Sequence, residues 1–174
     1  MSKLNLENID TGRIDEIQKS VESNSSIVIN IVNQIIKPYC KDLDDYVEFI
    51  NSILGDGENP PTNEELDDFC LNLSTLIYIA GSMCEQLGIR DDISKAVYKE
   101  TYHKARASLD SGTVADKDSL AELYSQQEQI TNVCYNRAYK IMRSKIENAQ
   151  ELLSSCKKVL SRRMSEFELT HMQR

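Results

Sequence analysis

The stretch SGTVADKDSL, Ser111–Leu120, separates two helical patterns and decides the shape of the second half of the chain. Its Ser-Gly pair ends one pattern, and Thr113 begins the next. From Val114 to about Leu169 there is neither Gly nor Pro, and apolar residues return to one side at helical spacing. One unbroken helix of this length would be roughly 80 Å long. Such a helix indicates a coiled coil or packing between subunits.

Two helices are expected before the first break in the chain. The first carries a heptad-like apolar stripe made of Ile14, Ile17, Val21, Val28, Ile31 and Ile35. Asn24 fills the remaining seam position, where a single Asn often fixes the register of a helix pair. We expect Pro38 to end this helix, because proline pushes the preceding residue out of the α region. A second, short helix follows, with apolar residues from Leu43 to Ile53 on one face.

The Gly- and Pro-rich segment Gly55–Pro61 is the clearest break in the chain. After it, Thr62 and Glu65 have the spacing of a capping box, which predicts the start of a third helix. Gly88 has the position of a residue that ends this helix. A fourth helix is expected to begin at the Asp pair that follows Gly88 and to end at the Ser-Gly break. Its apolar stripe consists of Ile93, Val97, Ala105 and Leu109.

These patterns predict an all-α fold: a helical bundle with a long C-terminal helix and coiled-coil-like oligomerisation. Charge divides the chain into an acidic helical region, 1–88, and a basic helical hairpin with the long helix, 89–174. Residues 1–92 hold 18 acidic and 6 basic side chains, whereas residues 93–174 hold 10 acidic and 14 basic side chains. An asymmetry of this kind can mark a nucleic-acid or self-association surface, or simply two solvated helix faces.

Cysteine usage and hydropathy suggest a cytoplasmic protein, in the host cytoplasm if a phage encodes it. The N-terminus has no apolar signal region, and the most apolar window, Ile27–Ile36, is too short to span a membrane. The five cysteines are widely spaced, odd in number and lack a C-x-x-C pair, so we expect buried, reduced thiols. They are Cys40, Cys70, Cys84, Cys134 and Cys156.

No pattern in the sequence favours an enzyme. His103 and His171 are isolated, so a zinc site is not expected, and the glycine-rich nucleotide-binding motifs are missing. The paired carboxylates stand near expected helix starts, where the helix dipole stabilises negative charge. We therefore expect no catalytic residues, no metal and no cofactor.

Basic residues beside tyrosines favour a single-stranded nucleic acid as partner. Cations can follow the phosphates of a single strand while aromatic rings stack on its bases. The candidate binding residues are Lys99, Tyr102, Lys104, Arg106, Arg137, Lys140 and Arg143. The competing interpretation is that the tyrosines belong to the core and the lysines solubilise its rim.

The segment HKARASLDSG, His103–Gly112, resembles the UvsY family of tailed-phage recombination mediators. The wider run YKETYHKARASLDSGTVADKDSLAELYSQQE and the ending IENAQELLSSCKKVLSRRMSE resemble small helical phage proteins. The resemblance covers roughly residues 90–168. It implies a non-enzymatic oligomer that binds single-stranded DNA and helps to load a recombinase. It also implies that Lys104 and Arg106 are the family's basic pair.

A second hypothesis is an interaction, scaffold or inhibitor protein that acts through its acidic N-terminal half. That half would dock on a basic partner protein. The candidate carboxylates are Asp42, Asp44, Asp45 and Glu48.

Overall fold

The computed structural model describes residues 11–55 and 59–172, which form four helices and no strand. The all-α prediction is confirmed. The helices are α1 (Thr11–Leu54), α2 (Asn63–Ala107), α3 (Val114–Tyr124) and α4 (Gln126–Met172).

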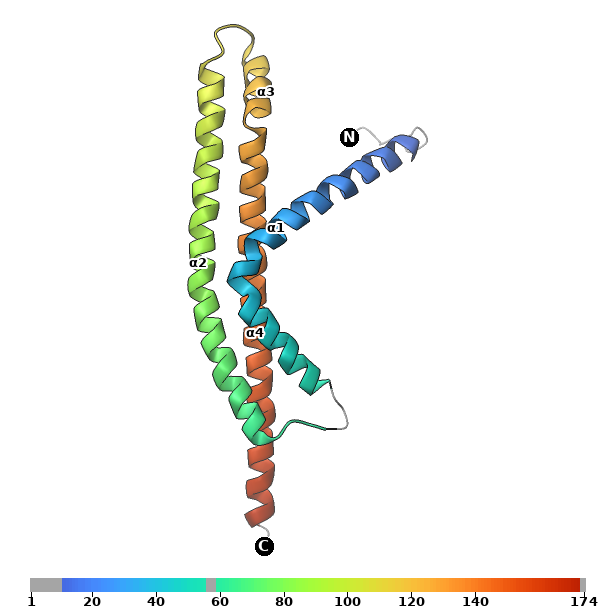
Figure 1. The fold of residues 1–174 in the computed structure, drawn as a ribbon, viewed down its shortest axis with the longest axis vertical. Coiled ribbons are helices and arrows are strands. Elements are labelled where there is room, and N and C mark those ends of the chain that lie inside the picture. The colour runs from blue at the N-terminus through green and yellow to red at the C-terminus, as the bar shows by residue number, and fades with distance from the viewer. Residues whose placement is uncertain (1–10, 56–58, 173–174) are drawn as a thin grey trace, which may run out of the picture.

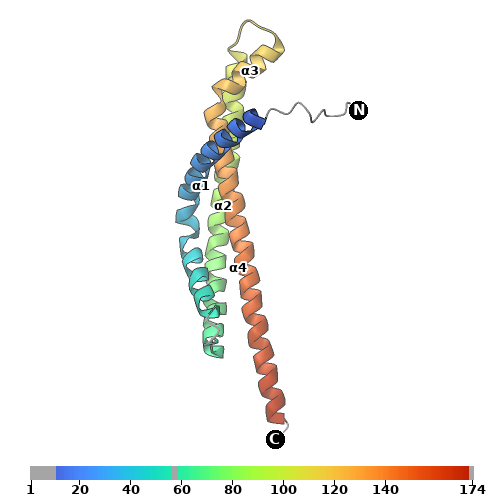
Figure 2. The ribbon, with the colours of Figure 1, turned by 90° about the vertical axis from the view of Figure 1, so that its right-hand side faces the viewer.

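The two longest helices, α2 and α4, form an antiparallel hairpin, and α3 continues the line of α4 (Figure 1). The hairpin turn lies at the predicted Ser-Gly break: Gly112 has φ +109°, in the region that favours glycine. Thr113 then caps α3, because its side chain accepts a hydrogen bond from the backbone N–H of Asp116. The capping box of Thr62 and Glu65 at the start of α2 is also confirmed. At the other end, α4 extends past the start of α2 (Figures 1 and 2).

The long helical pattern that begins at Val114 does not form one unbroken helix, because it is interrupted at Ser125. This buried residue leaves helical geometry, with φ −100° and ψ 11°. Its hydroxyl donates to the carbonyl of Ala121 at 2.8 Å, a local bond that competes with the regular helix. From Gln126 onward α4 is continuous to Met172.

Pro38 does not end the first helix, contrary to the prediction, and α1 runs through it. Proline lacks the N–H that would bond to the carbonyl of Gln34, so a bend is expected there. α1 does bend in its middle (Figure 1). Ile36 and Cys40, two residues before and two residues after Pro38, are buried. Their packing keeps the chain helical despite the missing backbone hydrogen bond.

Gly88 does not end a helix either, since α2 is continuous from Asn63 to Ala107. A Cβ atom at Gly88 would lie 3.2 Å from Cε2 of Tyr139 on α4. Gly88 is therefore a point of close approach between two helices. The predicted boundary between residues 1–88 and 89–174 falls inside this continuous helix.

The molecule has three parts, which we name by their residues. The base consists of 32–54 of α1, 63–87 of α2 and 138–160 of α4. The tip consists of 88–107 of α2, α3, Ser125 and 126–137 of α4. The arm is residues 12–31 of α1.

The hydrophobic core belongs almost entirely to the base, where α1 packs on the hairpin. Leu43, Ile50, Leu73, Leu87 and Met142 are among its buried side chains. By contrast, the four buried residues of the tip are all small: Ser94, Ala121, Ser125 and Cys134. All five cysteines are buried and free, as predicted.

The apolar stripe predicted at the N-terminus forms a helix but finds no cover within the chain. Ile14, Ile17 and Val21 are 49%, 55% and 59% exposed. Within the arm only Val28 is even partly buried. The arm projects away from the hairpin (Figure 1).

Candidate interaction site

The predicted basic pair lies at the end of α2, where Arg106 forms an ion pair with Asp118 of α3. The hydroxyl of Tyr102 donates to the same carboxylate at 3.2 Å. The hydrogen bond from Arg106 holds the pKa of Asp118 below its usual value. The pKa of Tyr102 is raised, first by desolvation and then by its bond to Asp118. This cluster ties α2 to α3 across the turn, so HKARASLDSG has an evident structural role.

Two other predicted cations are also paired within the chain. Lys104 Nζ lies 2.5 Å from Glu100, and Arg143 Nε lies 3.1 Å from Glu147. Both are exposed pairs one helical turn apart, and such pairs are weak enough for a phosphate to compete with them. The pairing therefore leaves both cations open to a ligand.

The remaining predicted cations, Lys99, Arg137 and Lys140, are exposed and form no ion pair with any of the residues in 11–55 and 59–172. They do not form one cluster. Asp91 of α2 faces Asn136 of α4, so Lys99 is about eight residues, or roughly 12 Å, farther along the hairpin than Arg137. The seven predicted nucleic-acid-binding residues are thus spread along the hairpin.

In the predicted acidic surface, Asp44 differs from its neighbours because it has two partners. Its carboxylate accepts from Lys145 Nζ at 2.6 Å and from Cys40 Sγ at 3.1 Å. Burial, with help from this carboxylate, raises the pKa of the Cys40 thiol to about 11, so the thiol is a poor nucleophile near neutral pH. Asp42, Asp45 and Glu48 are exposed.

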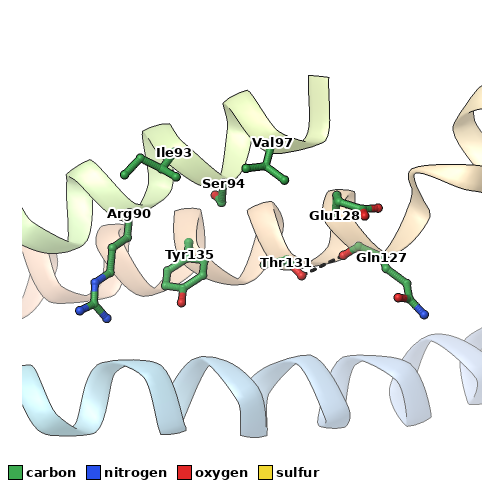
Figure 3. A pocket seen from close by; sticks show the side chains of 8 residues that line it. All are labelled: Arg90, Ile93, Ser94, Val97, Gln127, Glu128, Thr131 and Tyr135. Carbon is green, nitrogen blue, oxygen red and sulfur yellow. Dashed lines mark hydrogen bonds between the residues drawn. The ribbon is translucent and has the colours of Figure 1, made fainter. Parts of the chain in front are cut away.

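An open groove between α2 and α4 is the feature that the sequence did not reveal. It has a volume of about 450 Å³ and is lined only by α2 and α4 residues (Figure 3). Ile93 and Val97 line this groove, and they are 57% and 46% exposed to solvent. Both belong to the apolar stripe of the expected fourth helix, but nothing in the sequence indicates that this stripe would stay uncovered.

Arg90 marks the boundary between the open groove and the covered base. Its guanidinium lies 5.5 Å from the ring centroid of Tyr39, a cation–π contact between α2 and α1. Beyond it, the groove contains an unmet acceptor: Oε2 of Glu128 is buried and has no hydrogen-bond partner in the described part of the chain. A buried acceptor of this kind favours an incoming donor.

The second hollow lies between the arm and the outer side of α4, with a volume of about 470 Å³. Val21, Val28 and Val32 line it from α1, and Arg137 and Ile141 line it from α4. The arm thus leaves the hairpin beside α4 without entering the groove between α2 and α4.

Within residues 11–55 and 59–172, no cluster of His, Cys, Asp and Glu could hold a metal ion. No helix there is long and apolar enough to cross a membrane. The chain matches no family model, no curated protein and no solved structure. The resemblance to UvsY-type mediators stays a prediction.

Proposed function

We propose that this chain is a non-enzymatic protein-binding protein whose arm binds a helical surface of another polypeptide. The observation that carries the proposal is the exposed apolar face of the arm. Ile14, Val21 and Val28 are seven residues apart and lie on the same side of α1 as buried Val32. The face that forms the core in the base therefore continues into the arm, where it is uncovered. Exposed apolar faces of this kind mark interaction sites.

Site-specific photo-crosslinking in the cells that produce the protein tests this proposal. A photoreactive residue at Val21 is expected to form a covalent adduct with a polypeptide. The control is Ser23, which is exposed on the opposite face of the same helix. Equal adducts at both positions, or none at either, would contradict the proposal.

Single-stranded nucleic-acid binding, with assistance to a recombinase, is the second candidate function. It is favoured by Lys99, Arg137 and Lys140, which no described carboxylate neutralises. If these cations contact phosphates, affinity for a labelled single strand falls as salt rises and falls again when all three become Gln. The matched control is the same triple change to Gln at Lys41, Lys157 and Lys158, which are exposed cations of the base. An affinity that changes neither with salt nor with the triple substitution would contradict this candidate function.

A further inference from the structure

The open groove of the tip is the continuation of the groove that α1 fills in the base. In the base, Tyr46 of α1 donates to the carbonyl of Asp68 of α2 at 3.5 Å, and Lys145 of α4 bonds to Asp44 of α1. One helix thus contacts both walls there. In the tip the same walls have no third helix, and all groove-lining residues come from α2 and α4 (Figure 3).

The floor of the open groove suits a closely approaching helix. The only buried residues of the tip are small ones, so the floor presents little bulk. Ile93 and Val97 rise from the α2 wall, and Tyr135 from the α4 wall. A third helix would bury these apolar side chains and could supply a donor to Oε2 of Glu128.

The arm matches this groove in length. Its 20 residues, 12–31, extend about 30 Å, and α2 from Arg90 to its end extends roughly 25 Å. The two also match in charge. The arm holds two basic and three acidic residues, whereas the two walls of the groove, 88–107 and 126–137, hold six basic and four acidic residues.

The arm does not reach the groove of its own chain. After the bend in the middle of α1 it passes the outer side of α4, where Val21 and Val28 face Arg137 and Ile141. The groove lies between α2 and α4, and none of its lining residues comes from α1 (Figure 3). The molecule therefore has an uncovered helix and an unfilled helix-sized groove that do not meet within one chain.

We propose that the groove of each chain receives the arm of a second copy, which gives a two-fold symmetric dimer with two identical arm–groove contacts. This inference rests on the proposed function, since it names the polypeptide that the arm binds. The argument for a second copy is continuity: the arm extends the same helical face that already fills this groove in the base, and its charge complements the walls.

Sedimentation velocity over about a hundredfold range of concentration tests the dimer. Val21→Glu is expected to raise the dissociation constant at least ~100-fold, because each dimer carries the change twice and each copy places a charge in an apolar contact. Ser23→Glu, on the opposite face, is expected to leave it within about twofold. Both positions are exposed in the single chain, so helicity is expected to be unchanged.

A mixing experiment tests whether the arm meets the groove. Val97→Glu alters the groove and is expected to weaken the dimer as Val21→Glu does. A mixture of the two variants contains pairs in which one intact arm meets one intact groove. We therefore expect mixed dimers that are at least ~10-fold tighter than those of either variant alone.

Three results would overturn the proposal. A dimer weakened by Val21→Glu but not by Val97→Glu would mean that two arms pack on each other. Variants that weaken the dimer without any gain on mixing would exclude a reciprocal exchange. A chain that stays monomeric at every concentration excludes the second copy as occupant, while the Val21 photo-crosslink reports separately on whether the arm binds another polypeptide.

Discussion

The base and the tip are built from the same two helices, yet they bury very different side chains. Leu73 and Leu87 of α2 are completely buried in the base, whereas Ile93 and Val97, about two to three turns beyond Leu87, are about half exposed. The difference is the third helix, since α1 covers α2 only up to the contact of Tyr39 with Arg90, and Val32 is its last buried residue toward the arm. A helix pair alone cannot enclose large apolar side chains, so small buried residues and polar contacts hold the tip together.

The largest expected difference between the two parts follows from shortening one side chain in each. Leu73→Ala in the base leaves a cavity and is expected to lower the free energy of unfolding by ~2–5 kcal/mol. Val97→Ala in the tip is expected to change it by no more than about 0.5 kcal/mol in dilute protein, because the side chain is already half solvated. Urea denaturation of both variants measures this, and equal losses would contradict the division into base and tip.

The polar contacts of the tip centre on Asp91. Its substitution is expected to cause the next largest loss of unfolding free energy. Asn132 donates to Asp91 Oδ1 at 3.2 Å, and Asn136 donates to Asp91 Oδ2 at 2.9 Å. Asp91→Ala removes the acceptor of the partly buried Asn136 amide and one acceptor of Asn132, whose amide also donates to Ser94 Oγ at 3.0 Å. The substitution is expected to cost ~1–3 kcal/mol in a urea titration. Its exposed neighbour gives the control: Asp92→Ala is expected to have no measurable effect. Equal effects of the two substitutions would mean that these hydrogen bonds do not hold α2 to α4.

Two glycines of α2 have different surroundings: Gly81 faces open space, whereas Gly88 lies close to Tyr139 of α4. A Cβ at Gly81 would meet no atom within 4 Å beyond the adjacent residues and backbone of its own helix, so Gly81→Ala is expected to raise the free energy of unfolding by about 0.5–1 kcal/mol. Gly88→Ala is expected to gain less, because the new methyl group would press on the ring of Tyr139. Thermal and urea unfolding of the two variants test the order, and a larger gain at Gly88 would contradict it.

The smallest expected effect is at the exposed cluster of Arg106, Tyr102 and Asp118. Because the pKa of Asp118 is lowered in the folded chain, the cluster contributes stability above the ordinary Asp pKa and loses it as pH falls through the folded value. Asp118→Asn should therefore be less stable than the wild type at pH 7, with a difference that begins to shrink near pH 4 and disappears only below the lowered pKa of Asp118. Paired urea titrations at pH 7 and at stepwise lower pH measure this difference. A difference that grows in acid would contradict the assignment.

The parts of the fold that could be predicted from sequence depend on neighbouring residues. Thr62 with Glu65, and Gly112 with Thr113, are local signals for a helix start and a turn, and both are confirmed. Pro38 and Gly88 also carry local signals, but packing overrides them, through Ile36 and Cys40 at the first and Tyr139 at the second. Propensity alone cannot weigh such contacts.

The candidate site was harder to predict because it depends on residues far apart in the chain. Arg106 was identified as a cation from sequence, but its partner Asp118 meets it only because the turn brings α3 back to α2. The open groove depends on where α1 leaves the hairpin, which follows from the bend in α1. The apolar stripes of the arm and the tip can be predicted from the sequence, but their exposure to solvent cannot.

Hydrogen exchange along α1, read by mass spectrometry at low and high protein concentration, tests most directly whether the arm and the base differ as described. The account predicts that amides of residues 39–54 are protected at both concentrations, because this segment packs on the hairpin of its own chain. Amides of residues 12–31 are predicted to exchange fast in dilute protein and to become protected as concentration rises. Equal, concentration-independent protection along the whole of α1 would contradict the account.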